Sequence, residues 1–166
     1  MVALTASPAH ADYIFGTEGA DSLTGTERRD AMYGLGGWDF ISGGYGRDYL
    51  YGGYGWDHLI GGFGWDYVTG GAGSDRLDGG SGADRVRGRG GNDRVDGGSG
   101  DDFVVGGPGN DVVYGYTGSD SINGGSGNDY LFSANDDTYD RVYGGPGYED
   151  FVSQSGVYGC EEVYRR

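Results

Sequence analysis

A nine-residue repeat runs without a gap through most of this chain and constrains its fold more than any other feature. From Gly16 to Phe132 the sequence divides into thirteen consecutive nonapeptides, of which GGYGWDHLI (52–60) and GGFGWDYVT (61–69) are typical. The first position of every unit is Gly, the sixth is Asp, and the eighth is Leu, Ile, Val or Met. A strict short period of this kind indicates a solenoid, in which stacked units bury together what one unit cannot bury alone.

Each repeat position has a physical role. Glycine at positions one, two and four permits positive φ and lets backbone carbonyls converge in a tight turn. Positions seven to nine predict a short strand in which only position eight points inward. The predicted core is therefore the position-eight row: Leu23, Met32, Ile41, Leu50, Leu59, Val68, Leu77, Val86, Val95, Val104, Val113, Ile122 and Leu131.

The pattern G-G-x-G-x-D-x-U-x, where U is apolar, resembles the calcium-binding nonapeptide of the RTX (hemolysin-type) family. The resemblance implies an all-β fold, a right-handed parallel β-roll with two nonapeptides per turn and two sheets of short parallel strands. Residues eighteen apart would then stack at one strand spacing, about 4.8 Å. Position six would form two ladders of Asp, one of Asp21, Asp39, Asp57, Asp75, Asp93, Asp111 and Asp129, the other of Asp30, Asp48, Asp66, Asp84, Asp102 and Asp120.

Stacked carboxylates need a counter-ion. At that spacing two neighbours repel by about 1 kcal/mol in water and by ~3 to 4 kcal/mol at an effective dielectric constant of 20. Calcium takes six to eight oxygen ligands, whereas magnesium requires a tighter octahedron and keeps its waters. We therefore expect up to about eleven Ca²⁺, one per gap between stacked Asp. Beyond the ladders, the expected ligands are Asp140 and the turns at Gly43, Tyr45, Gly52, Tyr54, Gly61, Phe63, Gly70, Gly79, Gly97 and Gly106.

Composition supports metal-dependent folding. The chain has 40 Gly and only 36% hydrophobic residues, and one apolar residue per repeat cannot offset the conformational entropy of ordering the chain. Its 26 acidic residues outnumber 11 basic ones for a net charge of −15, which argues against nucleic acid and anionic membranes as partners. We expect an unfolded metal-free chain and a folded calcium-bound roll.

Some repeats depart from the pattern. Leu35, Arg89 and Tyr116 replace Gly at position two, and Arg28 replaces Gly at position four. Thr also stands at position two of the first two repeats, at Thr17 and Thr26. We expect weak or empty sites at these turns and the strongest sites between residues 43 and 80 and between 97 and 109.

The repeats define four segments. Residues 1–11 end in Ala9-His10-Ala11, which is typical of a signal-peptidase site, and are interpreted as a signal-peptide remnant. Residues 12–15 are expected to cap the roll, residues 16–132 form the thirteen repeats, and residues 133–166 form degenerate repeats and a C-terminal cap. The signal-like start predicts a secreted, extracellular protein.

Two functional hypotheses remain open. In the first, the chain is a structural, calcium-binding extracellular module without enzymatic activity, because HExxH and G-x-S-x-G motifs are absent. In the second, it binds an extracellular polysaccharide through the aromatic residues of repeats three to six, although these could simply pack across strands. The sequence contains no run of 18 apolar residues, so no membrane-spanning helix is expected. The open sheet edges at the ends of the roll favour a monomer or a weak end-to-end dimer. The aromatic residues are Trp38, Tyr45, Tyr49, Tyr51, Tyr54, Trp56, Phe63, Trp65 and Tyr67.

Overall fold

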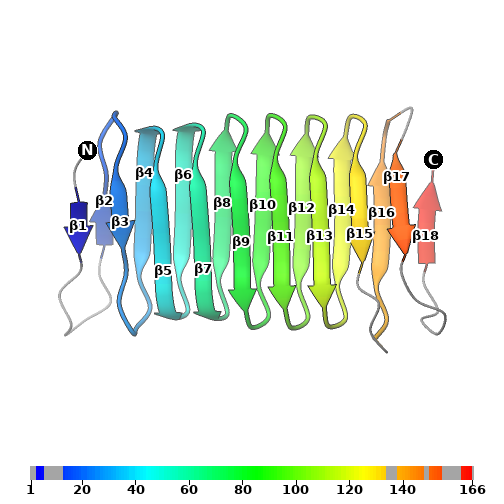
Figure 1. Ribbon diagram of the computed structural model, residues 1–166, viewed down its shortest axis with the longest axis horizontal. Helices are drawn as coiled ribbons and strands as arrows, with labels where there is room; N and C mark the ends of the chain where they lie inside the picture. Colours follow the sequence, from blue (N-terminus) through cyan, green and yellow to red (C-terminus); the bar gives the residue numbers. More distant parts are fainter. Residues whose placement is uncertain (1–2, 6–12, 134–137, 148–149, 155–161, 166) are drawn as a thin grey trace.

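The chain forms an elongated parallel β-roll (Figure 1). The computed structural model describes residues 3–5, 13–133, 138–147, 150–154 and 162–165. Within these residues the regular structure consists of strands, and no helix is found that is long and apolar enough to cross a membrane. The all-β prediction is therefore confirmed.

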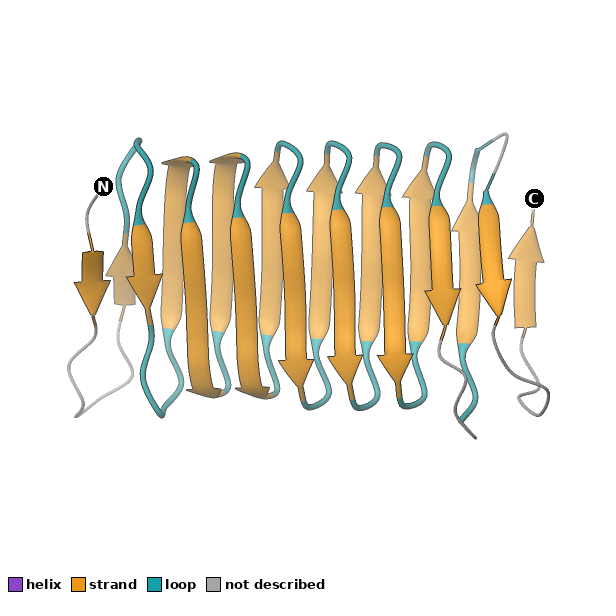
Figure 2. Cartoon of the chain, in the orientation of Figure 1, coloured by secondary structure: helices purple, strands orange, loops and turns teal. Residues whose placement is uncertain are grey.

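Successive strands alternate between two parallel sheets that face each other (Figure 2). We call them the odd sheet and the even sheet, after their strand numbers. The odd sheet contains β1 (Ala3–Thr5), β3 (Ser22–Thr24), β5 (Phe40–Gly46), β7 (His58–Gly64), β9 (Arg76–Ser81), β11 (Arg94–Ser99), β13 (Val112–Thr117), β15 (Tyr130–Ser133) and β17 (Phe151–Gln154). The even sheet contains β2 (Tyr13–Phe15), β4 (Ala31–Gly37), β6 (Tyr49–Gly55), β8 (Tyr67–Ala72), β10 (Arg85–Gly90), β12 (Phe103–Pro108), β14 (Ser121–Ser126), β16 (Arg141–Gly145) and β18 (Glu162–Arg165).

The register between neighbouring strands is eighteen residues through the regular repeats. Leu59 pairs with Leu77 in the odd sheet, and Leu50 pairs with Val68 in the even sheet. This register confirms two nonapeptides per turn. After Phe132 the register lengthens but the strands still stack: Ser121 pairs with Arg141, and Tyr130 pairs with Phe151.

The strands extend further than positions seven to nine. β5, for example, continues through Gly46, and Gly44, Tyr45 and Gly46 pair with the corresponding residues of β7. Gly44 has a φ of +99°, so the chain begins to turn there while its backbone still pairs with the next rung. The expectation of three-residue strands was wrong because it treated the glycine positions as turn only.

The N-terminal segment also contributes to the roll. β1, which falls within the expected signal-peptide remnant, pairs with β3, so that Leu4 lies opposite Leu23. β2 covers the opposite sheet by pairing with β4. Part of the segment interpreted as a signal-peptide remnant therefore forms a strand of the roll. Export of the chain remains a prediction.

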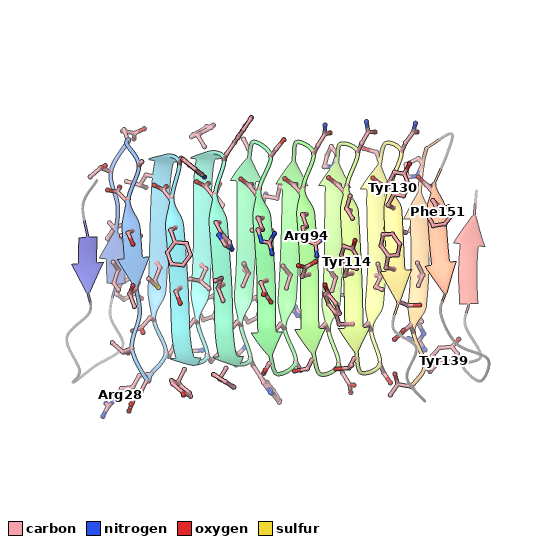
Figure 3. All side chains as sticks on the ribbon, viewed as in Figure 1. Arg28, Arg94, Tyr114, Tyr130, Tyr139 and Phe151 are labelled. Atoms are coloured by element: carbon pink, nitrogen blue, oxygen red, sulfur yellow. The ribbon has the colours of Figure 1, made fainter. Side chains whose placement is uncertain are left out.

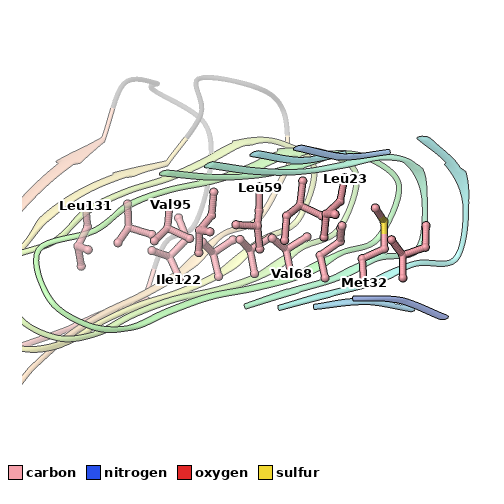
Figure 4. Packing of buried hydrophobic residues seen from close by; sticks show 14 of the residues in the cluster. Leu23, Met32, Leu59, Val68, Val95, Ile122 and Leu131 are labelled. Atoms are coloured by element: carbon pink, nitrogen blue, oxygen red, sulfur yellow. The ribbon is translucent and has the colours of Figure 1, made fainter. Parts of the chain in front are cut away.

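The core is a double row of aliphatic side chains between the sheets (Figure 4). All thirteen predicted position-eight residues are buried, with at most 2% of each exposed. Ile14 and Val142 extend the rows at the two ends. Because each repeat contributes a single buried side chain, the core is thin and contains only these two facing rows.

The outer face of the odd sheet carries a small cluster around Arg94. Its guanidinium lies 4.3 Å from the ring centroid of Tyr114 and forms a 3.0 Å ion pair with Asp96 (Figure 3). Asp96 is 5% exposed, and burial raises its pKa while the neighbouring Arg94 lowers it. This cluster covers the sheet and does not belong to the Asp ladders.

Truncating a core residue should destabilise the calcium-loaded roll. Leu59 is fully buried, so Leu59→Ala is expected to lower the free energy of unfolding by about 2 to 5 kcal/mol. Urea denaturation in saturating calcium measures this change. Ile60→Ala, on the half-buried outer face of the same strand, is the control and should have a clearly smaller effect. Equal losses would contradict the assignment of the core.

Candidate metal centre

The two predicted Asp ladders lie along opposite edges of the roll. The turn that carries Asp39 joins β4 to β5, and the turn that carries Asp48 joins β5 to β6. We call the row from Asp21 to Asp129 the odd ladder, on the upper edge in Figure 1, and the row from Asp30 to Asp120 the even ladder, on the lower edge. All thirteen aspartates are buried, with at most 3% of each exposed.

From the third rung onward, one oxygen of each ladder carboxylate links two rungs. Oδ1 of Asp66 accepts a hydrogen bond from the backbone N–H of Asp48 at 2.7 Å, and Oδ1 of Asp84 accepts one from Asp66. The same bond recurs along both ladders with donor–acceptor distances of 2.7 to 3.0 Å. Each aspartate therefore fixes the turn stacked beside it.

The other oxygen, Oδ2, points into the turn. In most rungs of the described ladders this atom is buried without a hydrogen-bond partner, which is costly for a carboxylate oxygen. A row of such atoms indicates positions made for a cation. They belong to Asp39, Asp48, Asp57, Asp66, Asp75, Asp84, Asp93, Asp102, Asp111 and Asp129.

Backbone carbonyls converge on the same places. A Cβ added to Gly43 would lie 2.6 Å from Oδ2 of Asp48 and 2.5 Å from the carbonyl oxygen of Gly61, one rung away. Gly61, with Asp66 and the carbonyl of Gly79, repeats the arrangement. Position one is therefore always Gly because a side chain there would fill a cradle of oxygen atoms.

Burial changes the titration of the ladder. Desolvation raises the pKa of Asp48 to about 7, against the hydrogen bond from the Asp30 N–H, and the carboxylates of Asp66 and Asp30 raise it further. The same causes raise the pKa of Asp84 to about 7 and, on the other edge, the pKa of Asp75 to about 7. Without a cation, the folded ladder disfavours its own negative charge.

This donor set fits calcium. Among the described residues, no group of three or more His, Cys, Asp or Glu side chains comes together, so carboxylates alone cannot complete a coordination sphere. Carbonyl oxygens supply further hard ligands, and Ca²⁺ accepts a mixed set of carboxylates and carbonyls in flexible geometry. Zinc and other softer metals prefer nitrogen and sulfur ligands, which the ladders lack.

The structure extends the predicted set of residues. Asp140 is buried, and its Oδ1 accepts the N–H of Asp120, which continues the even ladder as the sequence predicted. Asp150 similarly accepts the N–H of Asp129 at 3.2 Å; the sequence places it at the equivalent of position six in the degenerate unit 144–153, but it was not among the predicted ligands. The predicted glycines omitted Gly34, Gly88 and Gly124, which have the same cradle as Gly43. Their occurrence at position one was the signal that could have identified them.

The three aromatic residues predicted as carbonyl ligands have exposed side chains. Tyr45, Tyr54 and Phe63 are 55%, 74% and 56% exposed, so any part they take in metal binding is through the backbone. The rings of Tyr45 and Phe63 stack with centroids 4.9 Å apart, and those of Tyr49 and Tyr67 stack at 4.8 Å. Part of the aromatic set therefore packs across strands.

The first two rungs differ from the others. Oδ2 of Asp21 accepts hydrogen bonds from the backbone N–H of Thr17 at 2.5 Å and from its hydroxyl at 2.9 Å. Thr26 bonds Asp30 in the same way, at 2.7 and 2.8 Å. These threonines occupy the oxygen that is left without a partner further along, which gives a physical reason for the weak sites predicted there.

The other substitutions at position two strain the backbone. Leu35, Arg89 and Tyr116 adopt positive φ values of 79°, 80° and 68°, where the other regular repeats from the third onward place Gly. Such a conformation costs a non-glycine residue on the order of 1 to 3 kcal/mol. The turn geometry is nevertheless preserved, because Oδ2 of Asp39 and Asp93 lies in these turns as it does elsewhere.

Comparison with known proteins agrees with this geometry. A family model described as the RTX calcium-binding nonapeptide repeat matches the chain in overlapping copies at residues 9–34, 33–68, 60–95, 69–104, 96–131 and 105–139. No curated protein matches the chain. The matched residues contain both Asp ladders up to Asp129.

Acid should promote folding of the metal-free chain. Burial raises the pKa of Asp39 to about 6 and the pKa values of Asp48 and Asp75 to about 7, against 3.8 for an ordinary Asp, so the folded chain binds protons more tightly. This stabilisation is complete below the unfolded-state value and is lost as the pH rises through about 7. In EGTA, circular dichroism should detect more β-structure at about pH 5 than at about pH 8. A spectrum that loses β-structure on acidification would contradict the assignment.

Proposed function

Because this chain belongs to the RTX calcium-binding nonapeptide repeat family, we propose that it is a secreted module whose roll folds when calcium binds along both Asp ladders. The observation that carries the proposal is the row of buried Oδ2 atoms without hydrogen-bond partners. Bound Ca²⁺ would supply positive charge and take carboxylate and carbonyl oxygens as ligands. Its presence would remove the cost of burying these oxygens.

The chain's own residues prepare the sites. From the third rung onward, Oδ1 of the ladder Asp holds the neighbouring turn in place, and the position-one glycine leaves room for the cradle. Formation of one rung therefore positions ligands for the next, which favours cooperative folding along the roll. Up to about eleven ions are proposed for the thirteen rungs, with the lowest occupancy at the turns of Thr17 and Thr26.

The thin core and the charge of the chain support a calcium-dependent fold. One buried aliphatic residue per repeat gives limited apolar burial, and a net charge of −15 opposes compaction. Calcium at extracellular, millimolar levels would then act as the folding signal after export, in keeping with a family that is typical of secreted proteins.

We propose a structural and calcium-binding role without catalysis. The buried carboxylates of the described residues belong to the ladders and their continuation, with Asp96 as the exception. Asp96 forms an ion pair with Arg94 on the outer face of the odd sheet. This distribution places the buried acidic groups where they can bind cations.

Calcium should convert the chain from coil to roll. Far-UV circular dichroism of EGTA-treated protein near neutral pH, titrated with CaCl₂, is expected to give a cooperative increase in β-structure. Isothermal calorimetry should count several ions per chain. MgCl₂ is the control and should not induce the transition, because Mg²⁺ requires a tighter octahedron. An unchanged β spectrum in EGTA would contradict calcium-dependent folding.

Two adjacent aspartates provide a matched test of the ladder. Asp102 is 3% exposed and belongs to the even ladder, whereas Asp101 is exposed and lies outside it. Asp102→Asn keeps a side-chain oxygen that can accept the backbone N–H of Asp84, but it removes the negative charge of a calcium ligand. Calorimetry should therefore detect about one to two fewer calcium ions per chain. Asp101→Asn should bind calcium as the wild type does. Equal effects of the two substitutions would rule out a specific role for the ladder.

A further inference from the structure

A hollow lies on the edge of the roll that carries the even ladder, beside the starts of β8, β10 and β12. It has a volume of about 330 Å³ and is lined by Trp65, Ala83, Asp101 and Arg85, among others. Its origin is visible in the sequence. Position five of the even repeats reads Arg47, Trp65, Ala83 and Asp101, so that a small residue stands between two larger ones.

Trp65 provides a free aromatic wall. It is 63% exposed although it lines the hollow, so much of its indole faces solvent. The neighbouring Tyr67 packs within the sheet surface. Its ring stacks on that of Tyr49 with centroids 4.8 Å apart, and the guanidinium of Arg47 lies 5.3 Å from its ring centroid. Arg47 also donates a hydrogen bond to the Tyr67 hydroxyl at 3.0 Å. Trp65 is therefore the wall available to a ligand.

Polar groups of both signs surround this wall. Arg85 is exposed and offers N–H donors, while the exposed Asp101 offers a carboxylate acceptor. One oxygen of Asp101 already accepts the N–H of Ser119 at 2.9 Å, which fixes the orientation of the carboxylate. A purely anionic ligand would face Asp101 as well as Asp66, Asp84 and Asp102 of the ladder, and a purely cationic one would face Arg47 and Arg85. The lining favours a neutral molecule with donors, acceptors and an apolar face.

A sugar ring has these properties. Its C–H face can lie on an indole, and its hydroxyls both donate and accept hydrogen bonds, so an apolar surface and a few fixed polar groups suffice to orient it. We infer that the hollow beside Ala83 binds one ring of a neutral polysaccharide. The ring lies against Trp65, donates a hydroxyl to Asp101 and accepts from Arg85. The site requires the folded roll but does not require export, which concerns only the source of the polymer.

The opposite edge supplies a matched control. Trp56 also occupies position five and is 68% exposed, but it belongs to the odd repeats and lies on the upper edge. Trp56→Ala therefore removes a similarly exposed indole without touching the hollow. Position five accepts Arg, Trp, Ala and Asp along the even row, so Trp65→Ala and Ala83→Gln are both compatible with the turn.

Native affinity electrophoresis in saturating calcium tests the site. Gels contain hydroxyethyl cellulose, dextran or glucomannan as neutral probes, or polygalacturonate as an acidic probe. We expect at least one neutral polymer to retard the wild type. Trp65→Ala and Ala83→Gln should weaken this retardation by about tenfold or more, the first by removing the stacking surface and the second by filling the hollow. Trp56→Ala should be retarded like the wild type.

Three results would overturn the inference: no retardation by any neutral probe, retardation by polygalacturonate alone, or an equal loss with Trp56→Ala. Retardation that persists in both Trp65→Ala and Ala83→Gln would also place binding elsewhere. Calcium titrations by circular dichroism accompany each variant. If the wild-type chain folds on calcium addition but is retarded by no probe, the sugar site is contradicted while calcium-dependent folding stands.

Discussion

The stacking of buried carboxylates at eighteen-residue intervals is the constraint on which the rest of this structure depends. From the third rung onward, Oδ1 of each ladder Asp accepts the backbone N–H of the preceding rung, while Oδ2 points into the turn. The first interaction aligns the rungs, whereas the second places like charges in a low-dielectric environment. Burial and neighbouring carboxylates together raise the pKa of Asp84 to about 7, so the charges of the ladder oppose the alignment that its own hydrogen bonds create.

Glycine follows from the same constraint. At position one a side chain would collide with Oδ2 of the ladder Asp and with a carbonyl oxygen of the next rung, as at Gly43. At position two the chain needs a positive φ, which Leu35 adopts at the cost of strain. Positions one and two are therefore fixed by the turn, position six by the ladder and position eight by the core. Variation is left to positions three, five, seven and nine, whose side chains lie on the turns and outer faces.

The repeat pattern predicted the aliphatic core, and the resemblance to the RTX family, which implies two nonapeptides per turn, predicted the two sheets and both Asp ladders. Each of these features depends only on position within the repeat. The sequence did not predict features that depend on which residues meet across rungs. For example, the Thr17 hydroxyl donates a hydrogen bond to Oδ2 of Asp21, a local contact that the repeat pattern does not specify. The strands extend past position nine because glycine with positive φ still pairs with the next rung.

The division of the repeat also separates calcium binding from other recognition. A substitution at position five changes the surface of an edge without changing the carboxylate at position six, as the adjacent Asp101 and Asp102 illustrate. Ala83 opens a hollow between two rungs whose buried Asp66 and Asp84 keep the same inward geometry. If calcium binding drives folding, as proposed, the ladders control whether the roll forms, and the outward side chains control what the folded roll contacts. A ligand that binds only the folded edge must then raise the apparent calcium affinity by thermodynamic linkage.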